Sequence, residues 1–326
     1  MEKKDRLCLD IIGNVLNYLD PKKAMSFCTM STAWNTMILD HDPTKRVIPW
    51  LTFNKYFSWA MHNIVDDRKS FEVSVPGGYE KYEVEQIYHG WMVSFSESSK
   101  LLISLYNPFS RAKIYLPTCK ESIFFGTTYL SSGLENPDST LIITTKTTIF
   151  SWRKGDTSWT IEEKPNHDQW IITSLAGHFY ALEEESTELI SFQLFPLRIT
   201  RLGVKILVTE EVQQHYLVES RGELWLVLEH CSFDIYVYRL DLECKAWVKM
   251  DCLGDRALLL DGYPDSLGIS VPAHETGYES NYIYLIHDME VLIMKYGCNK
   301  LISKTDVRKL GQHASNRIFW ITPSSN

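Results

Sequence analysis

The stretch Gly90-Trp91-Met92-Val93-Ser94-Phe95 begins with a glycine and continues as a run of aromatic and aliphatic residues. Trp, Val and Phe are enriched in strands, and glycine is typical of the turns between them. Similar runs recur from Val47 onward, where long helical patterns are absent. They include Leu141-Ile142-Ile143-Thr144, Glu223-Leu224-Trp225-Leu226-Val227, Ile235-Tyr236-Val237-Tyr238 and Tyr282-Ile283-Tyr284-Leu285. Many short strands separated by turn residues predict a sandwich, a barrel or a propeller.

A repeat in the spacing of these strands distinguishes the three architectures. A glycine followed by an alternating aromatic and aliphatic strand occurs at Gly90, Gly177 and Gly222. The intervals are 45 residues between positions 177 and 222, and 87 between positions 90 and 177. These are close to one and two units of about 44 residues, and the missing member falls near Gly133.

A second series has the same period. In it a polar turn leads to a bulky strand residue, at Ile114, Trp159 and Trp247, and the missing member falls near Ile199. A unit of about 44 residues is the size of one four-stranded propeller blade. Chance spacing is the alternative, but a sandwich has no reason to keep two series in phase. We therefore expect a mainly β protein with a propeller of about six blades, while five or seven remain open.

The two ends of the β-rich region also carry strand patterns. These are Pro49-Trp50-Leu51-Thr52-Phe53 and Ile318-Phe319-Trp320-Ile321. A propeller must close its ring so that no long strand edge is left unpaired. We expect the two segments to share or adjoin one blade.

The first 46 residues carry three short patterns with helical spacing. Apolar residues at i, i+3, i+4 and i+7 indicate the first helix: Ile12, Val15, Leu16 and Leu19. Asp20-Pro21 separates it from the second, because Asp caps free N–H groups and Pro suits the first helical position. The second and third patterns are Ala24, Phe27 and Cys28, and Trp34, Met37 and Ile38. We expect a three-helix module over residues 1–46 and a β-propeller over residues 47–326. The apolar stripes could bury one another, pack on the propeller or bind a partner.

This helical module resembles the F-box. The residues that carry the resemblance are Leu7, Leu9, Ile12, Leu16, Leu19, Pro21, Ala24, Phe27, Ser31 and Trp34. The resemblance implies docking on the Skp-type adaptor of a cullin-based ubiquitin ligase, with these expected contacts: Leu9, Ile12, Leu16, Leu19, Pro21 and Trp34. Three helices of about 10 residues cannot bury every stripe among themselves, so a surplus apolar face is physically reasonable. The chain departs from the usual Leu-Pro opening, since it reads Leu7-Cys8-Leu9.

The remainder of the chain resembles the KIB-type β-propeller domain, which is found chiefly in plant F-box proteins. The motifs that carry this resemblance are Pro49-Trp50-Leu51, His89-Gly90-Trp91-Met92-Val93, Asn107-Pro108-Phe109-Ser110, Ile114-Tyr115-Leu116-Pro117, Leu224-Trp225-Leu226-Val227, the stretch 233–247 and Phe319-Trp320-Ile321-Thr322-Pro323-Ser324. Both halves stand in the family's usual order. The resemblance implies an adaptor whose propeller binds an unidentified protein substrate.

Composition excludes several other classes of protein. The formal net charge is -8 and the pI is about 5.7, which argues against a nucleic-acid partner. The chain has no run of about 18 apolar residues, so we expect no membrane span. Seven scattered cysteines, without a C-x-x-C pair, indicate a reduced compartment, the cytoplasm or the nucleus.

No motif for a catalytic site occurs, and we expect neither an enzyme nor a cofactor. His89 and His178 both adjoin a glycine and could be metal ligands around a channel, or could bind backbone groups at a turn. The clusters Glu183-Glu184-Glu185 and Glu210-Glu211 are expected to be solvated loop charges. Two alternatives to the adaptor remain: a propeller scaffold that no longer docks on a ligase, and a metal-dependent propeller enzyme.

Overall fold

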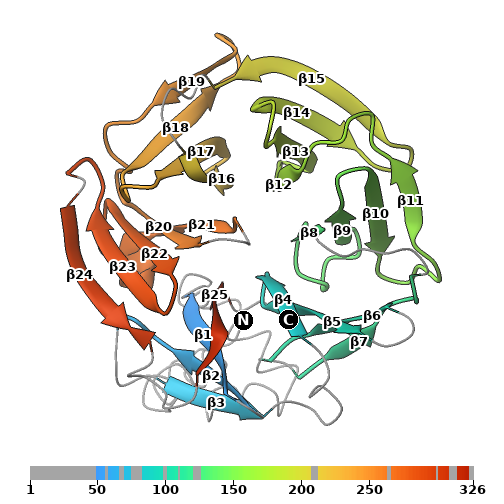
Figure 1. Ribbon diagram of the computed structural model, residues 1–326, viewed down its shortest axis with the longest axis horizontal. Coiled ribbons are helices and arrows are strands. Elements are labelled where there is room, and N and C mark those ends of the chain that lie inside the picture. The colour runs from blue at the N-terminus through green and yellow to red at the C-terminus, as the bar shows by residue number, and fades with distance from the viewer. Residues whose placement is uncertain are drawn as a thin grey trace, which may run out of the picture.

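Short strands form six sheets that surround a central axis (Figure 1). The structure, a computed structural model, describes residues 49–55, 58–65, 70–74, 83–97, 101–108, 111–119, 126–206, 212–262, 266–298, 300–307 and 314–322. The predicted propeller of six blades is confirmed within this part of the chain. The helical module expected over residues 1–46 lies outside the described residues.

Five blades have four antiparallel strands each. The first consists of β25 (Ala314–Ile321), β1 (Trp50–Lys55), β2 (Ser58–His62) and β3 (Ser70–Ser74). The second consists of β4 (Glu83–Tyr88), β5 (Trp91–Glu97), β6 (Leu101–Tyr106) and β7 (Lys113–Tyr115). The third consists of β8 (Thr127–Leu130), β9 (Thr140–Thr144), β10 (Thr148–Arg153) and β11 (Thr160–Glu163). The fourth consists of β12 (Trp170–Leu175), β13 (His178–Glu183), β14 (Glu188–Gln193) and β15 (Arg198–Lys205). The fifth consists of β16 (Val212–Ser220), β17 (Glu223–His230), β18 (Ile235–Asp241) and β19 (Ala246–Lys249).

The sixth blade has a fifth strand, which the sequence did not predict. It consists of β21 (Gly268–Pro272), β20 (Arg256–Asp261), β22 (Tyr282–His287), β23 (Glu290–Lys295) and β24 (Lys300–Asp306), in this order from the centre outward. After β20 the chain turns back along the channel as β21, and the short helix α4 (Ala273–Thr276) then leads to β22, which runs parallel to β20. All of β20 is buried, because β21 covers its inner edge and other blades flank it. A fully buried strand accounts for the unbroken apolar run 257–260.

The two repeat series correspond to equivalent positions in successive blades. Gly90, Gly177 and Gly222 each end a two-residue turn between the first and second strands of a blade. Both residues of these turns have positive φ, for example 50° at Ala176 and 79° at Gly177. Such turns match the twist of a β-hairpin and favour glycine. The member expected near Gly133 is a longer connection, residues 131–139.

The second series marks the outermost strand in the second to fifth blades. Ile114 lies in β7, Ile199 in β15 and Trp247 in β19, while Trp159 directly precedes β11. The missing member was therefore predicted at the correct place.

The ring closes where β25 pairs with β1 in the first blade. Trp50 lies opposite Ile321, and Leu51 lies opposite Trp320. The Trp320 side chain is 1% exposed, and its Nε1 donates a hydrogen bond to the Leu260 carbonyl of the sixth blade at 3.3 Å. The expectation that the two terminal segments share one blade is confirmed.

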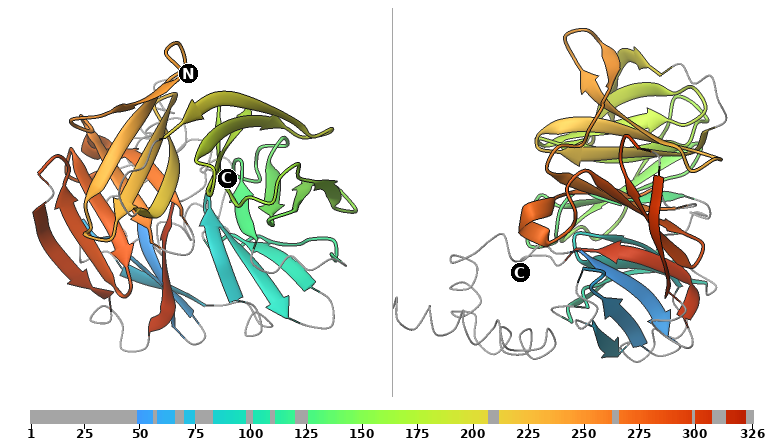
Figure 2. Two further views of the ribbon diagram at one scale, coloured as in Figure 1. Left: turned by 45° about the horizontal axis from the view of Figure 1, so that its top comes forward. Right: turned by 90° about the vertical axis from the view of Figure 1, so that its left-hand side faces the viewer.

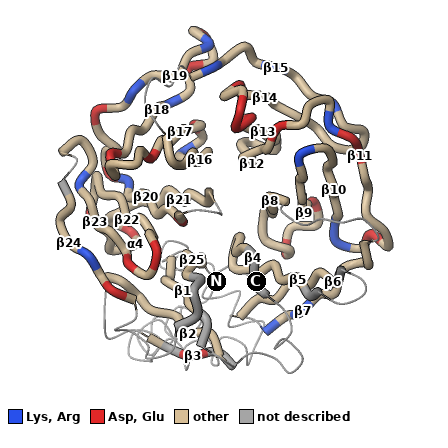
Figure 3. The backbone as a smooth tube through the Cα atoms, in the orientation of Figure 1, with Lys and Arg blue, Asp and Glu red and all other residues tan. Residues whose placement is uncertain are grey.

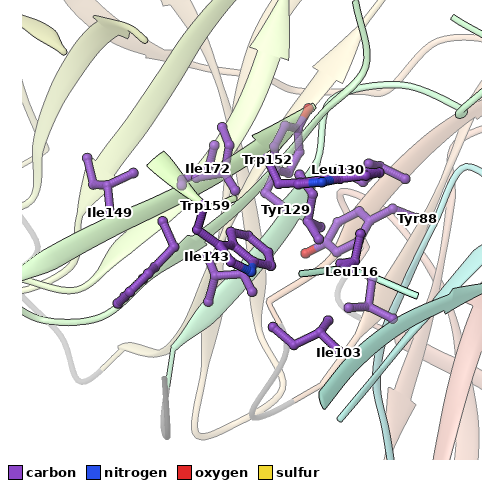
Figure 4. Close-up of a cluster of buried hydrophobic side chains, with 14 of the residues drawn as sticks. Tyr88, Ile103, Leu116, Tyr129, Leu130, Ile143, Ile149, Trp152, Trp159 and Ile172 are labelled. Carbon is purple, nitrogen blue, oxygen red and sulfur yellow. The ribbon is translucent and has the colours of Figure 1, made fainter. Parts of the chain in front are cut away.

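The core consists of apolar layers between neighbouring blades. One layer joins the second, third and fourth blades and includes Tyr88, Tyr129, Trp152 and Trp159 (Figure 4). Trp159 Nε1 donates to the Pro117 carbonyl of the preceding blade at 2.8 Å. Other clusters lie between the first and second, the fourth and fifth, the fifth and sixth, and the sixth and first blades. Every blade therefore buries both faces against its neighbours.

Candidate functional site

A cavity of about 630 Å³ lies in the central channel. Its lining comes from all six inner strands, β4, β8, β12, β16, β21 and β25. In Figure 1 these strands surround the centre of the ring. The cavity is the candidate site, because it has the size of a binding pocket and is formed by every blade.

Apolar and polar residues both line the cavity. The strands β4, β12 and β16 each end at one of the glycine turns, so residues earlier in these strands lie deeper in the channel. The deeper positions include Ile87, Ile171 and Leu217, which are largely buried. The rim includes the turn residues His89 and Gly222. We call this end the channel mouth.

Further polar residues line the mouth: Ser174, Glu219, Ser270 and Thr322. Tyr129 donates a hydrogen bond from its hydroxyl to Ser174 Oγ at 2.8 Å, which links the third blade to the fourth. The hydroxyls of Ser220 and Ser270 are 2.8 Å apart and link the fifth blade to the sixth. Burial raises the pKa of Tyr129, so its phenol is neutral at physiological pH. These groups stabilise the ring around the mouth.

Among the described residues that line the cavity, Glu219 alone carries a formal charge at neutral pH. Glu219 Oε1 accepts a hydrogen bond from the Gly222 backbone N–H at 2.8 Å. His89 retains contact with solvent, but the surrounding protein desolvates it and lowers the pKa of its imidazole, while a hydrogen bond with the Leu130 backbone opposes this effect. A lowered pKa leaves His89 neutral at pH 7, so the cavity has an acidic lining.

Glu219 acts electrostatically on Arg256, and Arg256 and Arg221 also contact other groups. Arg221 forms an ion pair with Asp255, which lies just before β20. Arg256 is buried, and it donates from Nε to Ser270 Oγ at 2.9 Å and from Nη2 to the Ser270 carbonyl at 2.7 Å. Charged positions elsewhere lie mainly on outer strands and loops (Figure 3), and three of the six inner strands, β8, β12 and β21, carry none.

The possible metal ligands do not converge. His89 lies at the turn after β4, and His178 is the exposed first residue of β13, two blades further on. Within the part of the chain that the structure describes, no group of three or more His, Cys, Asp or Glu side chains could hold a metal ion. No helix of that part is long and apolar enough to cross a membrane.

One expected solvated charge is in fact buried. The Glu183 side chain at the end of β13 is 1% exposed, which corrects the prediction that this cluster is entirely solvated. Its carboxylate accepts hydrogen bonds from Asn166 Nδ2 at 2.6 Å and Ser186 Oγ at 2.8 Å, and forms an ion pair with Arg201 at 3.0 Å. Glu184 and Glu185 are exposed as predicted, and Glu210-Glu211 lies outside the described residues. A buried charge requires such partners, and two of them here, Asn166 and Arg201, are 17 and 18 positions away from Glu183.

A second buried carboxylate, Glu229, lies in β17. Tyr216 donates to Glu229 Oε2 at 2.6 Å, and both side chains are almost fully buried. Burial raises the pKa of Glu229, an effect that the Tyr216 hydrogen bond and nearby His287 oppose. The pair lies outside the cavity and we assign it a structural role.

Replacing Tyr216 by phenylalanine is expected to lower the free energy of urea unfolding by about 2 kcal/mol, because the Glu229 carboxylate loses its donor while it stays buried.

Glu229→Gln keeps an acceptor for Tyr216 and removes the charge. The pKa of Glu229 is higher in the folded protein than in the unfolded chain. The contribution of Glu229 to stability is therefore complete below the unfolded pKa, about 4.3, and is lost as the pH rises through the folded pKa. Urea unfolding between pH 4 and 8 should therefore show the wild type losing stability relative to Glu229→Gln. Glu163→Gln, at an exposed position on β11, is the control and should run parallel to the wild type.

The residues expected to dock on the adaptor are Leu9, Ile12, Leu16, Leu19, Pro21 and Trp34. All of them lie outside the described residues, so their role stays a prediction. Sequence reasoning in turn missed the cavity, because its lining is assembled from short pieces of six strands that are far apart in the sequence.

Comparisons with known proteins give matches for both parts of the chain. The family model described as KIB1-4 beta-propeller matches residues 61–308, and the F-box domain model matches residues 5–46. F-box protein At1g49360 of Arabidopsis thaliana is 25% identical over 278 residues, covering 78% of this chain and 56% of the relative. F-box/kelch-repeat protein At1g57790 of the same organism is 21% identical over 278 residues, covering 78% of this chain and 75% of the relative. The chain thus spans little more than half the length of the first relative.

Among solved structures, a chain of the nidogen/laminin complex aligns with a TM-score of 0.46 and 8% identity. The alignment covers 85% of the present chain and 99% of that chain.

Proposed function

Because this chain belongs to the KIB1-4 β-propeller family and carries an F-box domain, we propose that it is the substrate-recognition subunit of a Skp-cullin-F-box (SCF) ubiquitin ligase. The two matches confirm both resemblances seen in the sequence. Neither matched family is catalytic. In this proposal the F-box binds a Skp-type adaptor, which joins the cullin core, while the propeller binds the protein that is to be ubiquitylated.

The single observation that carries the proposal is the joint presence of an F-box match and a propeller match in one chain. Such a protein accelerates ubiquitin transfer by proximity, since it holds the substrate near a charged enzyme and raises its effective concentration. We place the boundary between the two domains at residues 46 and 47, and the docking contacts at Leu9, Ile12, Leu16, Leu19, Pro21 and Trp34. We further propose that the protein acts in the cytoplasm or the nucleus, without nucleic-acid or membrane partners.

The described chain begins on the channel-mouth side of the propeller. Pro49 precedes β1, its carbonyl accepts a hydrogen bond from Tyr278 at 3.0 Å, and the next residue pairs with Ile321 beside the mouth. The F-box match ends at residue 46. Three residues span at most about 11 Å, so the docking module would be tethered close to this face of the propeller.

Direct binding tests the proposal. The purified full chain is mixed with a purified Skp-type adaptor and analysed by size-exclusion chromatography with light scattering. We expect one complex of equal stoichiometry, which then also retains the N-terminal part of a cullin. Separate elution of the two proteins at micromolar concentration would contradict the proposal and favour a propeller scaffold that does not dock on a ligase.

A further inference from the structure

We infer that the channel mouth is the substrate-binding site, and that it accepts a protein segment with an apolar anchor side chain next to a lysine or arginine. The apolar side chain enters the cavity, and the basic residue lies at the rim against Glu219. This inference rests on the proposed adaptor function and specifies the chemistry of its substrate.

The first argument is the shape and lining of the cavity. A volume of about 630 Å³ is ample for one large side chain and part of its neighbours. The wall includes Ile87, Ile171 and Leu217 from three different blades, so an inserted side chain would meet apolar groups in addition to the polar ones. Binding energy in protein interfaces is concentrated on such buried anchors.

The second argument is the arrangement of the apolar and acidic groups. Leu217 and Glu219 are two residues apart on β16, so their side chains lie on the same face of the strand. Leu217 is buried in the wall, whereas Glu219 is exposed at the rim. A segment that inserts an apolar side chain over Leu217 would therefore bring its adjacent residue to Glu219.

The third argument is charge. Among the described residues that line the cavity, none is a lysine or an arginine. The charged groups near Arg256 are one cation, Arg221, and three carboxylates, those of Asp255, Glu219 and Glu275. Asp255 also forms an ion pair with Arg221. Recognition of a phosphorylated or acidic motif requires a cluster of available cations, and the mouth has the opposite character. An ammonium or guanidinium group complements it.

The fourth argument is the position of the mouth. The helix α4 projects from one face of the ring (Figure 2). It follows β21 directly, and β21 lines the cavity up to Ser270. Pro49 lies on this same side, where Tyr278 binds its carbonyl just after α4. A substrate at the mouth would thus be held near the point where the docking module joins the propeller.

Selection from a display library of random 12-residue peptides tests the inference, with the full chain bound to the Skp-type adaptor as the immobilised target. We expect enrichment of peptides in which an aromatic or long aliphatic residue adjoins Lys or Arg. Selected peptides are then measured by fluorescence anisotropy. Glu219→Gln should weaken their binding about tenfold, which corresponds to losing one partly desolvated ion pair. Glu243→Gln, an equal loss of charge at an exposed turn outside the cavity, should leave binding unchanged.

A second variant tests insertion into the cavity independently of charge. Thr322 lines the mouth at the end of β25, and Thr322→Trp should fill part of the cavity and weaken binding by tenfold or more. Thermal unfolding of both variants shows whether the fold is intact. Enrichment of acidic peptides, absence of enrichment, or equal affinity of wild type, Glu219→Gln and Thr322→Trp would each overturn the inference. All variants should still bind the adaptor, so failure at the mouth is distinguishable from failure of the proposed adaptor function.

Discussion

Replacing Trp320 by alanine is expected to destabilise the propeller severely, by about 4 kcal/mol. Trp320 is 1% exposed, and its ring packs edge-on against Tyr278 with the centroids 6.3 Å apart. The change would leave a cavity between the sixth and first blades and would remove the donor that binds the Leu260 carbonyl. Because this residue lies opposite Leu51 in the closing strand pair, the loss falls on the contact that holds the ring together.

The measurement is thermal unfolding of the full chain, in which the midpoint should fall by about 10 °C for a domain of this size. Trp247→Ala is the matched control, since Trp247 lies half-buried on the outermost strand β19 and plays no part in closure. A fall of only a few degrees is expected for that variant. Equal falls for the two variants would show that closure has no special weight in the stability of the ring.

Replacing Leu16 by aspartate is expected to weaken adaptor binding on the order of a hundredfold. Leu16 lies on the apolar stripe of the first predicted helix, four residues after Ile12 and three before Leu19. If this stripe is the docking face, the aspartate places an unpaired charge in an apolar interface, and the cost of desolvating it is large. Calorimetric titration of the full chain with the Skp-type adaptor measures the change.

The matched control is Asn17→Asp, which adds the same charge to the neighbouring position, off the apolar stripe. It should bind as the wild type does. Circular dichroism and thermal unfolding of both variants establish that the propeller is unchanged. Equal affinity of wild type and Leu16→Asp would refute this interface, even if the chain binds the adaptor through another surface.

Local rules explain which parts of the fold were predictable from the sequence. The positive φ angles at positions 90, 177 and 222 favour glycine, and these glycines therefore reveal the period of the blades. Closure by the two terminal strands follows from the need to pair their edges, and the structure has the register Trp50 with Ile321. The period and the closing pair thus follow from requirements of the backbone, whereas the period left five, six or seven blades open.

Other features depend on contacts between distant residues. The apolar run 257–260 identifies a buried strand, but it does not show that β21 would lie inside it or that β22 would run parallel to it. Glu183 belongs to an acidic run, and the Arg201 that compensates its burial lies on β15. The acidic mouth likewise combines Glu219 of β16 with apolar residues of other blades. No local pattern encodes these combinations, because each depends on how strands pair within a blade or on how the blades come together around the channel.

The joining of β1 to β25 also has a consequence for biosynthesis. Trp50 emerges from the ribosome early, whereas Ile321, its partner, is 271 positions later in the chain. At typical elongation rates the nascent polypeptide waits on the order of tens of seconds with β1 unpaired on that side. During this interval the later blades can assemble, while the first one stays incomplete and exposes a strand edge to chaperones or to aggregation. A premature stop codon ahead of β25 would make this transient species permanent.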